Sequence, residues 1–240
     1  MSLNGACNAL RLVKWNPIVG GVRLVPDRLA DPLRWRKPRR VFVNSMSDLF
    51  HEELVAHDGD DPQDDSAGAV RKVFAVMLAA GQHQFQVLTK RAERMRWWFG
   101  DIGREAESRS MAIAELLWST YFDGFGEDLG NWRLWRWPPP NVWLGVSVED
   151  QATADERIPH LLATPAAVRW VSYEPALGPV DLSRLYTRGS FMGAVDVVID
   201  ATRGRYAAAW DGPKTAVHDH EPPCPRLDWI VGGGESGPGA

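Results

Sequence analysis

Five short apolar stretches recur along the chain, and each is followed by small polar or charged residues. The stretches are residues 41–43, 84–88, 141–146, 168–171 and 227–231. Apolar runs of this length, bounded by polar turns, are typical of strands buried on both faces of a parallel sheet. Because parallel strands end at one rim, we expect the polar residues that follow them to share one site.

The polar and charged residues at these strand exits are therefore the candidate site residues. They combine hydroxyl, amide, carboxylate and basic groups, the groups with which proteins hold a polar ligand. The candidates are Asn44, Ser45, Asp48, Thr89, Lys90, Arg91, Ser147, Glu149, Ser172, Glu174 and Glu235.

Helical periodicity between the predicted strands completes an α/β pattern. Apolar spacing predicts helices over residues 70–78, from 90 to 99, and over 152–162. A strand, a helix and a second strand within about 30 residues form a βαβ unit. We therefore predict an α/β fold, a parallel partial (β/α) barrel of about five to six strands.

The domain organisation follows from the same pattern. Residues 1–240 are predicted to form one α/β domain, with residues 100–137 and 184–226 as insertions within it. Residues 10–15 partly alternate and predict a first strand. Residues 51–55 have the composition of a helix start.

The first 40 residues are rich in arginine and lysine, with bases clustered towards residue 40. Two interpretations stay open. The bases form a solvated surface, or they form a surface that faces phosphates. The net charge of the whole chain is −4, so charge alone gives no general attraction to nucleic acid.

The composition of the chain indicates its cellular compartment. No apolar run approaches the 18 or so residues of a membrane span, and residues 1–5 lack the basic start of a signal peptide. Two cysteines, Cys7 and Cys224, are too few for a disulfide framework. We expect a cytoplasmic protein with no membrane partner.

Three local patterns bear on chemistry. The glycine-rich exit at residues 232–237 has neither the lysine of a Walker loop nor the position of a Rossmann fingerprint, so we interpret it as one wall of the site. Glu149 and Glu174 are either a paired acid and base or salt-bridge partners of Lys90 and Arg91. Residues 218–224 contain zinc-ligand types at no standard spacing, so no metal site is predicted.

Seven segments, taken in order, resemble one family. They are Trp15-Asn16-Pro17 and residues 32–40, 43–52, 87–91, 141–149, 172–182 and 233–240. The chain resembles a phage-type family of uncharacterised proteins, found in phages and bacterial chromosomes, whose members look like radical S-adenosylmethionine proteins. The resemblance implies a radical-SAM-type barrel, with S-adenosylmethionine and a [4Fe–4S] cluster as cofactors.

This chain departs from the family pattern at the cluster. In relatives the Trp-Asn-Pro segment runs into a loop with three cysteines, which would hold three of the irons. Here residues 15–20 join directly to residues 21–26, and neither Cys7 nor Cys224 replaces the loop. We expect no working cluster in this copy, and we expect the barrel to be incomplete at its C-terminus.

Three functions stay open after this comparison. The first is an enzyme of radical-SAM descent that acts on a nucleic acid or a nucleotide-like substrate. The second is a non-catalytic binding module or a decayed remnant of the barrel. The third is a metal-assisted hydrolase that uses carboxylates at the strand exits.

Overall fold

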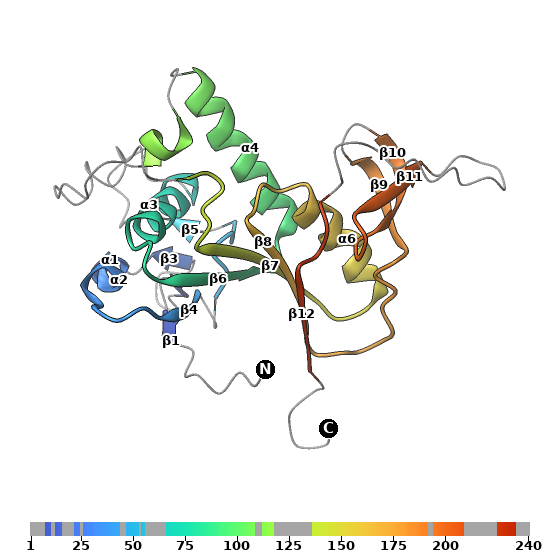
Figure 1. Cartoon of the computed structure of the whole chain (residues 1–240), viewed down its shortest axis with the longest axis horizontal. Helices are drawn as coiled ribbons and strands as arrows, with labels where there is room; N and C mark the ends of the chain where they lie inside the picture. Colours follow the sequence, from blue (N-terminus) through green and yellow to red (C-terminus); the bar gives the residue numbers. More distant parts are fainter. Residues whose placement is uncertain are drawn as a thin grey trace. The chain divides into compact units, whose positions relative to one another are not determined.

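The structure is a computed structural model of the chain, drawn as a ribbon in Figure 1. It describes residues 8–10, 13–15, 22–24, 26–43, 47–52, 54–55, 66–108, 112–117, 136–191, 194–208 and 225–233. The predictions for Cys7, Asn44, Ser45, residues 218–224 and Glu235 lie outside these residues. The chain divides into two compact units, each described by itself: unit 1 holds residues 1–89 and 97–143, and unit 2 holds residues 90–96 and 144–240.

Unit 1 is built on parallel strands. β1 (Asn8–Leu10), β4 (Arg40–Val43) and β6 (Gln84–Thr89) are hydrogen-bonded in that order, with Val41 opposite Phe85. Both of these side chains are fully buried. The apolar stretches at residues 41–43 and 84–88 are therefore strands, as predicted.

Two long helices accompany these strands. α3 (Ser66–Ala79) begins four residues before the predicted helix, and α4 (Ala92–Ser108) continues past the predicted end into the segment expected to be an insertion. In unit 1 their aromatic side chains form a cluster. Phe74 stacks on Trp98 at 4.8 Å and meets Phe99 edge-on at 5.4 Å, and Phe99 stacks on Trp137. Such ring pairs add to the stabilisation from apolar burial.

The prediction of a helix start at residues 51–55 is wrong. Leu54–Val55 is a short strand, β5, which pairs with β3 (Val22–Leu24), and β3 pairs in turn with β2 (Val13–Trp15). Leu54 is fully buried. Pairing with β3 and burial outweigh the local preference of the two glutamates before it. The single strand predicted over residues 10–15 is also split, between β1 and β2.

Two short helices precede β4. α1 (Pro26–Leu29) and α2 (Asp31–Arg34) are separated by one residue, and Pro32 lies at the start of α2, where its missing N–H costs nothing. Sequence reasoning assigned no element here.

Unit 2 holds three of the predicted strands. β7 (Val142–Val148), β8 (Val168–Tyr173) and β12 (Trp229–Gly232) follow in that order, and β8 and β12 are parallel, with Ser172 opposite Val231. The first two residues of β7 belong to unit 1. α6 (Gln151–Leu162) connects β7 to β8, as the βαβ pattern predicted, and it buries Ala154, Ile158 and Leu161.

A small antiparallel sheet fills most of the described part of the segment after residue 184. β9 (Leu185–Phe191), β10 (Ala194–Asp200) and β11 (Arg205–Ala208) are joined in the order β11-β10-β9. Figure 1 draws this sheet beside α6, and Tyr186 N donates to Asp155 Oδ1 of α6 at 3.0 Å. The contact fastens the start of β9 to α6.

The structure confirms the α/β class, with parallel strands that alternate with helices. The division into one domain with two insertions stays a prediction. In the described part of the chain, no helix has both the length and the apolar character needed to cross a membrane.

Candidate functional site

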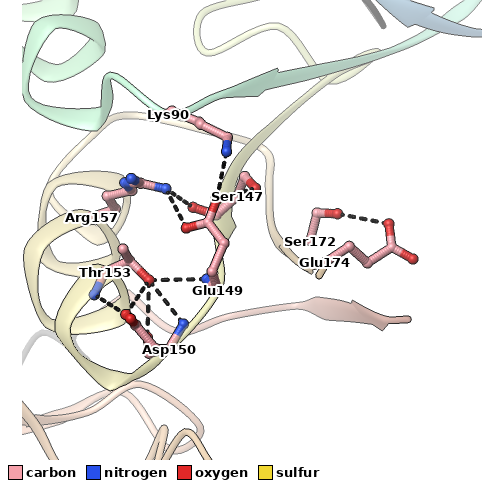
Figure 2. A network of polar contacts seen from close by, with 8 residues as sticks. All are labelled: Lys90, Ser147, Glu149, Asp150, Thr153, Arg157, Ser172 and Glu174. Atoms are coloured by element: carbon pink, nitrogen blue, oxygen red, sulfur yellow. Dashed lines mark hydrogen bonds and ion pairs between the residues drawn. The ribbon is translucent and has the colours of Figure 1, made fainter. Parts of the chain in front are cut away.

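A buried carboxylate lies at the end of β7, in unit 2. Glu149 directly follows the strand and is 8% exposed. Lys90 Nζ lies 2.6 Å from Glu149 Oε1, and Arg157 Nη1 lies 2.9 Å from Glu149 Oε2. Each carboxylate oxygen therefore has its own cationic partner, as Figure 2 shows.

Arg157 reaches this carboxylate from the second turn of α6. The same nitrogen donates to the main-chain oxygen of Ser147 at 2.7 Å, so one guanidinium holds both the strand and the acid after it. The Arg157 side chain is 14% exposed, whereas that of Lys90 is 59% exposed. Arg157 is thus an interior partner of Glu149 and Lys90 a surface one.

The electrostatics of Glu149 follow from these contacts. Burial raises the pKa of the carboxyl, but the hydrogen bond from Lys90 and the positive charges of Arg157 and Lys90 together outweigh it. The pKa of Glu149 is therefore held below its ordinary value, and the group is ionised at neutral pH.

The start of α6 fixes where Arg157 points. Asp150 is the N-cap: its Oδ1 accepts from Thr153 N at 2.9 Å, while Thr153 Oγ1 accepts from Asp150 N at 3.1 Å. This reciprocal capping box satisfies main-chain N–H groups that the helix leaves unpaired. The backbone and side-chain hydrogen bonds from Thr153 lower the pKa of Asp150.

A second acid, Glu174, follows β8 and differs from Glu149. Its side chain is exposed, and Ser172 Oγ donates to its Oε2 at 3.2 Å. Among the described residues it has no ion-pair partner. In Figure 2 its carboxylate lies beside Ser172 and apart from the Lys90–Glu149–Arg157 group.

The end of β12 leaves room for Glu174. Gly233 N donates to Tyr173 O, and Ala176 N donates to Gly233 O, both at 3.2 Å. A Cβ on Gly233 would lie within 3.0 Å of three atoms of the Glu174 side chain. Glycine at this position therefore lets the acid lie against the main chain.

In unit 1 a separate pair joins two other candidates. Thr89 Oγ1 donates to Asp48 Oδ1 at 2.7 Å, and the same oxygen accepts from Phe50 N at 2.9 Å. The pair connects the end of β6 to the turn that follows β4. Arg91 lies just before α4, where its main-chain oxygen accepts from Met95 N.

The structure thus brings the predicted residues into three groups: Lys90 with Ser147 and Glu149, Ser172 with Glu174, and Asp48 with Thr89. For Glu149 the salt-bridge interpretation holds, with Lys90 as predicted and Arg157 in addition. That all the candidates share one site stays a prediction.

Sequence reasoning missed Arg157 and Thr153. A signal existed for both. In a helix that begins right after Asp150, residue 153 is the third helical position, the partner in a capping box. Residue 157 lies four positions later, on the same helix face.

Among the described residues, no group of three or more His, Cys, Asp or Glu is placed to hold a metal ion. Both carboxylate oxygens of Glu149 pair with cationic side chains, whereas in a metal site they would coordinate the ion.

Comparison with known proteins gives a family without an assigned activity. A protein-family model described as "Protein of unknown function (DUF5131)" matches residues 5–240. No curated protein and no solved structure matches the chain.

Proposed function

Since the chain belongs to the DUF5131 family of proteins of unknown function, we propose a function from its own residues. Unit 2 binds a small ligand that carries ammonium and carboxylate groups, and the strand ends around Glu174 receive its ammonium. The resemblance to radical S-adenosylmethionine proteins supplies the nucleoside part of the proposal. S-adenosylmethionine is therefore the first candidate ligand.

The observation that carries the proposal is the contrast between Glu174 and Glu149. Glu149 is neutralised by two cations, so it has a structural role. Glu174 is exposed, has a neutral partner in Ser172 and no ion-pair partner among the described residues. A carboxylate oriented by a hydroxyl and open to solvent is suited to accept a charge-assisted hydrogen bond from a ligand ammonium.

The charges at these strand ends support a ligand with both signs. Lys90, Arg157 and Glu149 together carry one positive charge, and Glu174 carries one negative charge. An amino-acid moiety has the same two charges on its carboxylate and ammonium groups.

The iron–sulfur cluster of the resembling family does not fit this chain. Such a cluster takes three cysteine thiolates from the protein and leaves the fourth iron for S-adenosylmethionine. The sequence contains two cysteines, and both lie outside the described residues. The proposal is therefore ligand binding, with no step that passes through a cluster.

Calorimetric titration of the full chain with S-adenosylmethionine tests the proposal. Glu174→Gln should weaken binding by about tenfold or more, the expected effect of losing a charge-assisted hydrogen bond. Glu156→Gln, which removes an exposed acid from α6, is the matched control and should bind like the parent. S-adenosylhomocysteine, which lacks the sulfonium, and methionine, which lacks the nucleoside, are titrated in parallel. Their affinities show how much each part of S-adenosylmethionine contributes to binding.

Two results would overturn the proposal. One is the absence of binding for all three ligands. The other is equal affinity of the parent and Glu174→Gln, which would remove the acid from the site even if the ligand binds elsewhere.

A further inference from the structure

The segment before β4 concentrates positive charge on unit 1. Five of the seven residues from 34 to 40 are basic, and none is acidic: Arg34, Arg36, Lys37, Arg39 and Arg40. The chain as a whole has a net charge of −4. The basic segment, as we call residues 34–40, is therefore a local exception to the charge of the protein.

Four of these bases are exposed to solvent. Arg34, Arg36, Lys37 and Arg40 are exposed, and within the described part of the chain none of the four forms an ion pair. The nearest acid in sequence, Asp31, is paired with Arg28 at 3.2 Å. Like charges kept this close without neutralisation repel one another, and a bound anion would relieve the repulsion.

A single buried histidine holds the chain at two points, at Pro32 just before the basic segment and at Arg39 within it. His83 is 1% exposed; its Nδ1 accepts from Arg39 N at 3.2 Å, and its Nε2 bonds to Pro32 O at 2.9 Å. Since Nδ1 accepts, the imidazole proton lies on Nε2 and is donated to the Pro32 carbonyl. Both main-chain anchors are thus fixed from inside unit 1.

Two ring contacts complete the support. Trp35 lies edge-on to His83 at 5.5 Å, and the Arg39 guanidinium lies 4.5 Å from the centre of the Trp35 ring. Arg39 therefore lies over the Trp35 ring, whereas the other four bases of the segment are exposed to solvent. A loop that is already ordered loses little conformational entropy when it binds.

We propose that the basic segment binds the phosphate backbone of a nucleic acid through Arg34, Arg36, Lys37 and Arg40. Guanidinium groups match phosphate oxygens with paired hydrogen bonds, and several phosphates in a row suit several bases in a row. Phosphate contacts carry no sequence information, so binding through these four bases is independent of sequence.

A membrane partner fits the segment less well. Peripheral membrane segments combine bases with exposed apolar side chains that enter the bilayer. The exposed large apolar residues of the described chain are Trp97, Leu177, Tyr186 and Ile230, and none lies in the basic segment.

Fluorescence anisotropy with labelled duplex DNA, single-stranded DNA and single-stranded RNA tests this proposal across a series of salt concentrations. If four phosphates are contacted, the logarithm of the affinity should fall with the logarithm of salt with a slope of about −3 to −4. The variant Arg34→Gln/Arg36→Gln/Lys37→Gln/Arg40→Gln should lose at least tenfold in affinity, and its salt slope should fall towards zero.

A matched variant controls for bulk charge. Arg184→Gln/Arg203→Gln/Arg205→Gln/Arg226→Gln removes four exposed bases from unit 2, so both variants change the net charge from −4 to −8. The control should bind like the parent. Equal loss in both variants, no binding of any nucleic acid, or binding of phosphatidylserine vesicles instead would overturn the proposal.

Discussion

The indole of Trp170 on β8 fills the space that a side chain at position 145 on β7 would take. A Cβ on Gly145 would lie within 2.6 Å of three atoms of this ring, and Trp170 is 3% exposed. The glycine thus lets a large buried ring lie directly against the neighbouring strand.

This contact predicts opposite effects for two glycine-to-alanine changes. Gly145→Ala should destabilise the protein by about 1–3 kcal/mol, because a rigid buried ring must shift to admit the methyl group. Gly103→Ala, in α4, meets nothing within 4 Å and should stabilise the protein by up to about 1 kcal/mol. Urea unfolding measures both, and equal effects would refute this account of Gly145.

Arg157 should contribute more than Lys90 to the stability of the protein through their ion pairs with Glu149. Arg157→Met should cost about 3 kcal/mol, because it leaves a buried carboxylate with one of its cations missing. Lys90→Met should cost less than about 1 kcal/mol, since that ammonium is largely exposed and screened by water. The free energies of unfolding of the two variants test this, and a larger loss for Lys90→Met would contradict it.

Lowering the pH should reduce the free energy of unfolding through protonation of Glu149. Because its folded-state pKa is lowered, the ionised form contributes stability that is complete above the ordinary value of 4.5 and is lost as the pH falls through the folded-state value. The difference in unfolding free energy between the parent and Glu149→Gln should therefore be larger at pH 7 than at pH 3. A difference that stays constant over this range would exclude the coupling.

The N-cap of α6 offers a test at the helix end. Asp150→Ala removes the acceptor of the Thr153 N–H and should lower Tm by about 2–4 °C. Asp150→Ser keeps an oxygen acceptor for the Thr153 N–H and should recover most of this loss in Tm. Thermal unfolding followed by circular dichroism compares them, and indistinguishable variants would show that the cap contributes little.

Four of the five predicted strands, β4, β6, β7 and β8, could be predicted because their apolar runs are short, largely buried and followed by polar residues. Val41 and Phe85 illustrate this, since both lie on paired strands and are fully buried. The fifth, β12, was predicted from the same pattern, but its Ile230 is exposed. β5 could not be predicted, because Leu54 gains its strand conformation from pairing with Val22, a partner more than 30 residues away in sequence. Local composition carries no information about such a partner.

Only part of the candidate site could be predicted, again because some contacts are made by residues distant in sequence. A strand exit places Lys90, Glu149 and Glu174 at strand ends, but their roles depend on neighbours from other elements. Arg157 helps to neutralise Glu149 through an ion pair, and the missing side chain of Gly233 leaves the space that Glu174 occupies. Spacing from the N-cap of α6 places Arg157 on a helix face but does not identify Glu149 as its partner. The contact of Gly233 with Glu174 has no spacing signal at all.

The two anchors of His83 also restrict how the basic segment can evolve. Pro32 O and Arg39 N both bond to one small ring, so the distance between these two main-chain atoms is set by the ring's dimensions. Substitutions at the exposed positions 34, 36 and 37 leave these anchors untouched, whereas an insertion or deletion moves one anchor away from the imidazole. Natural variants should therefore retain the length of this segment.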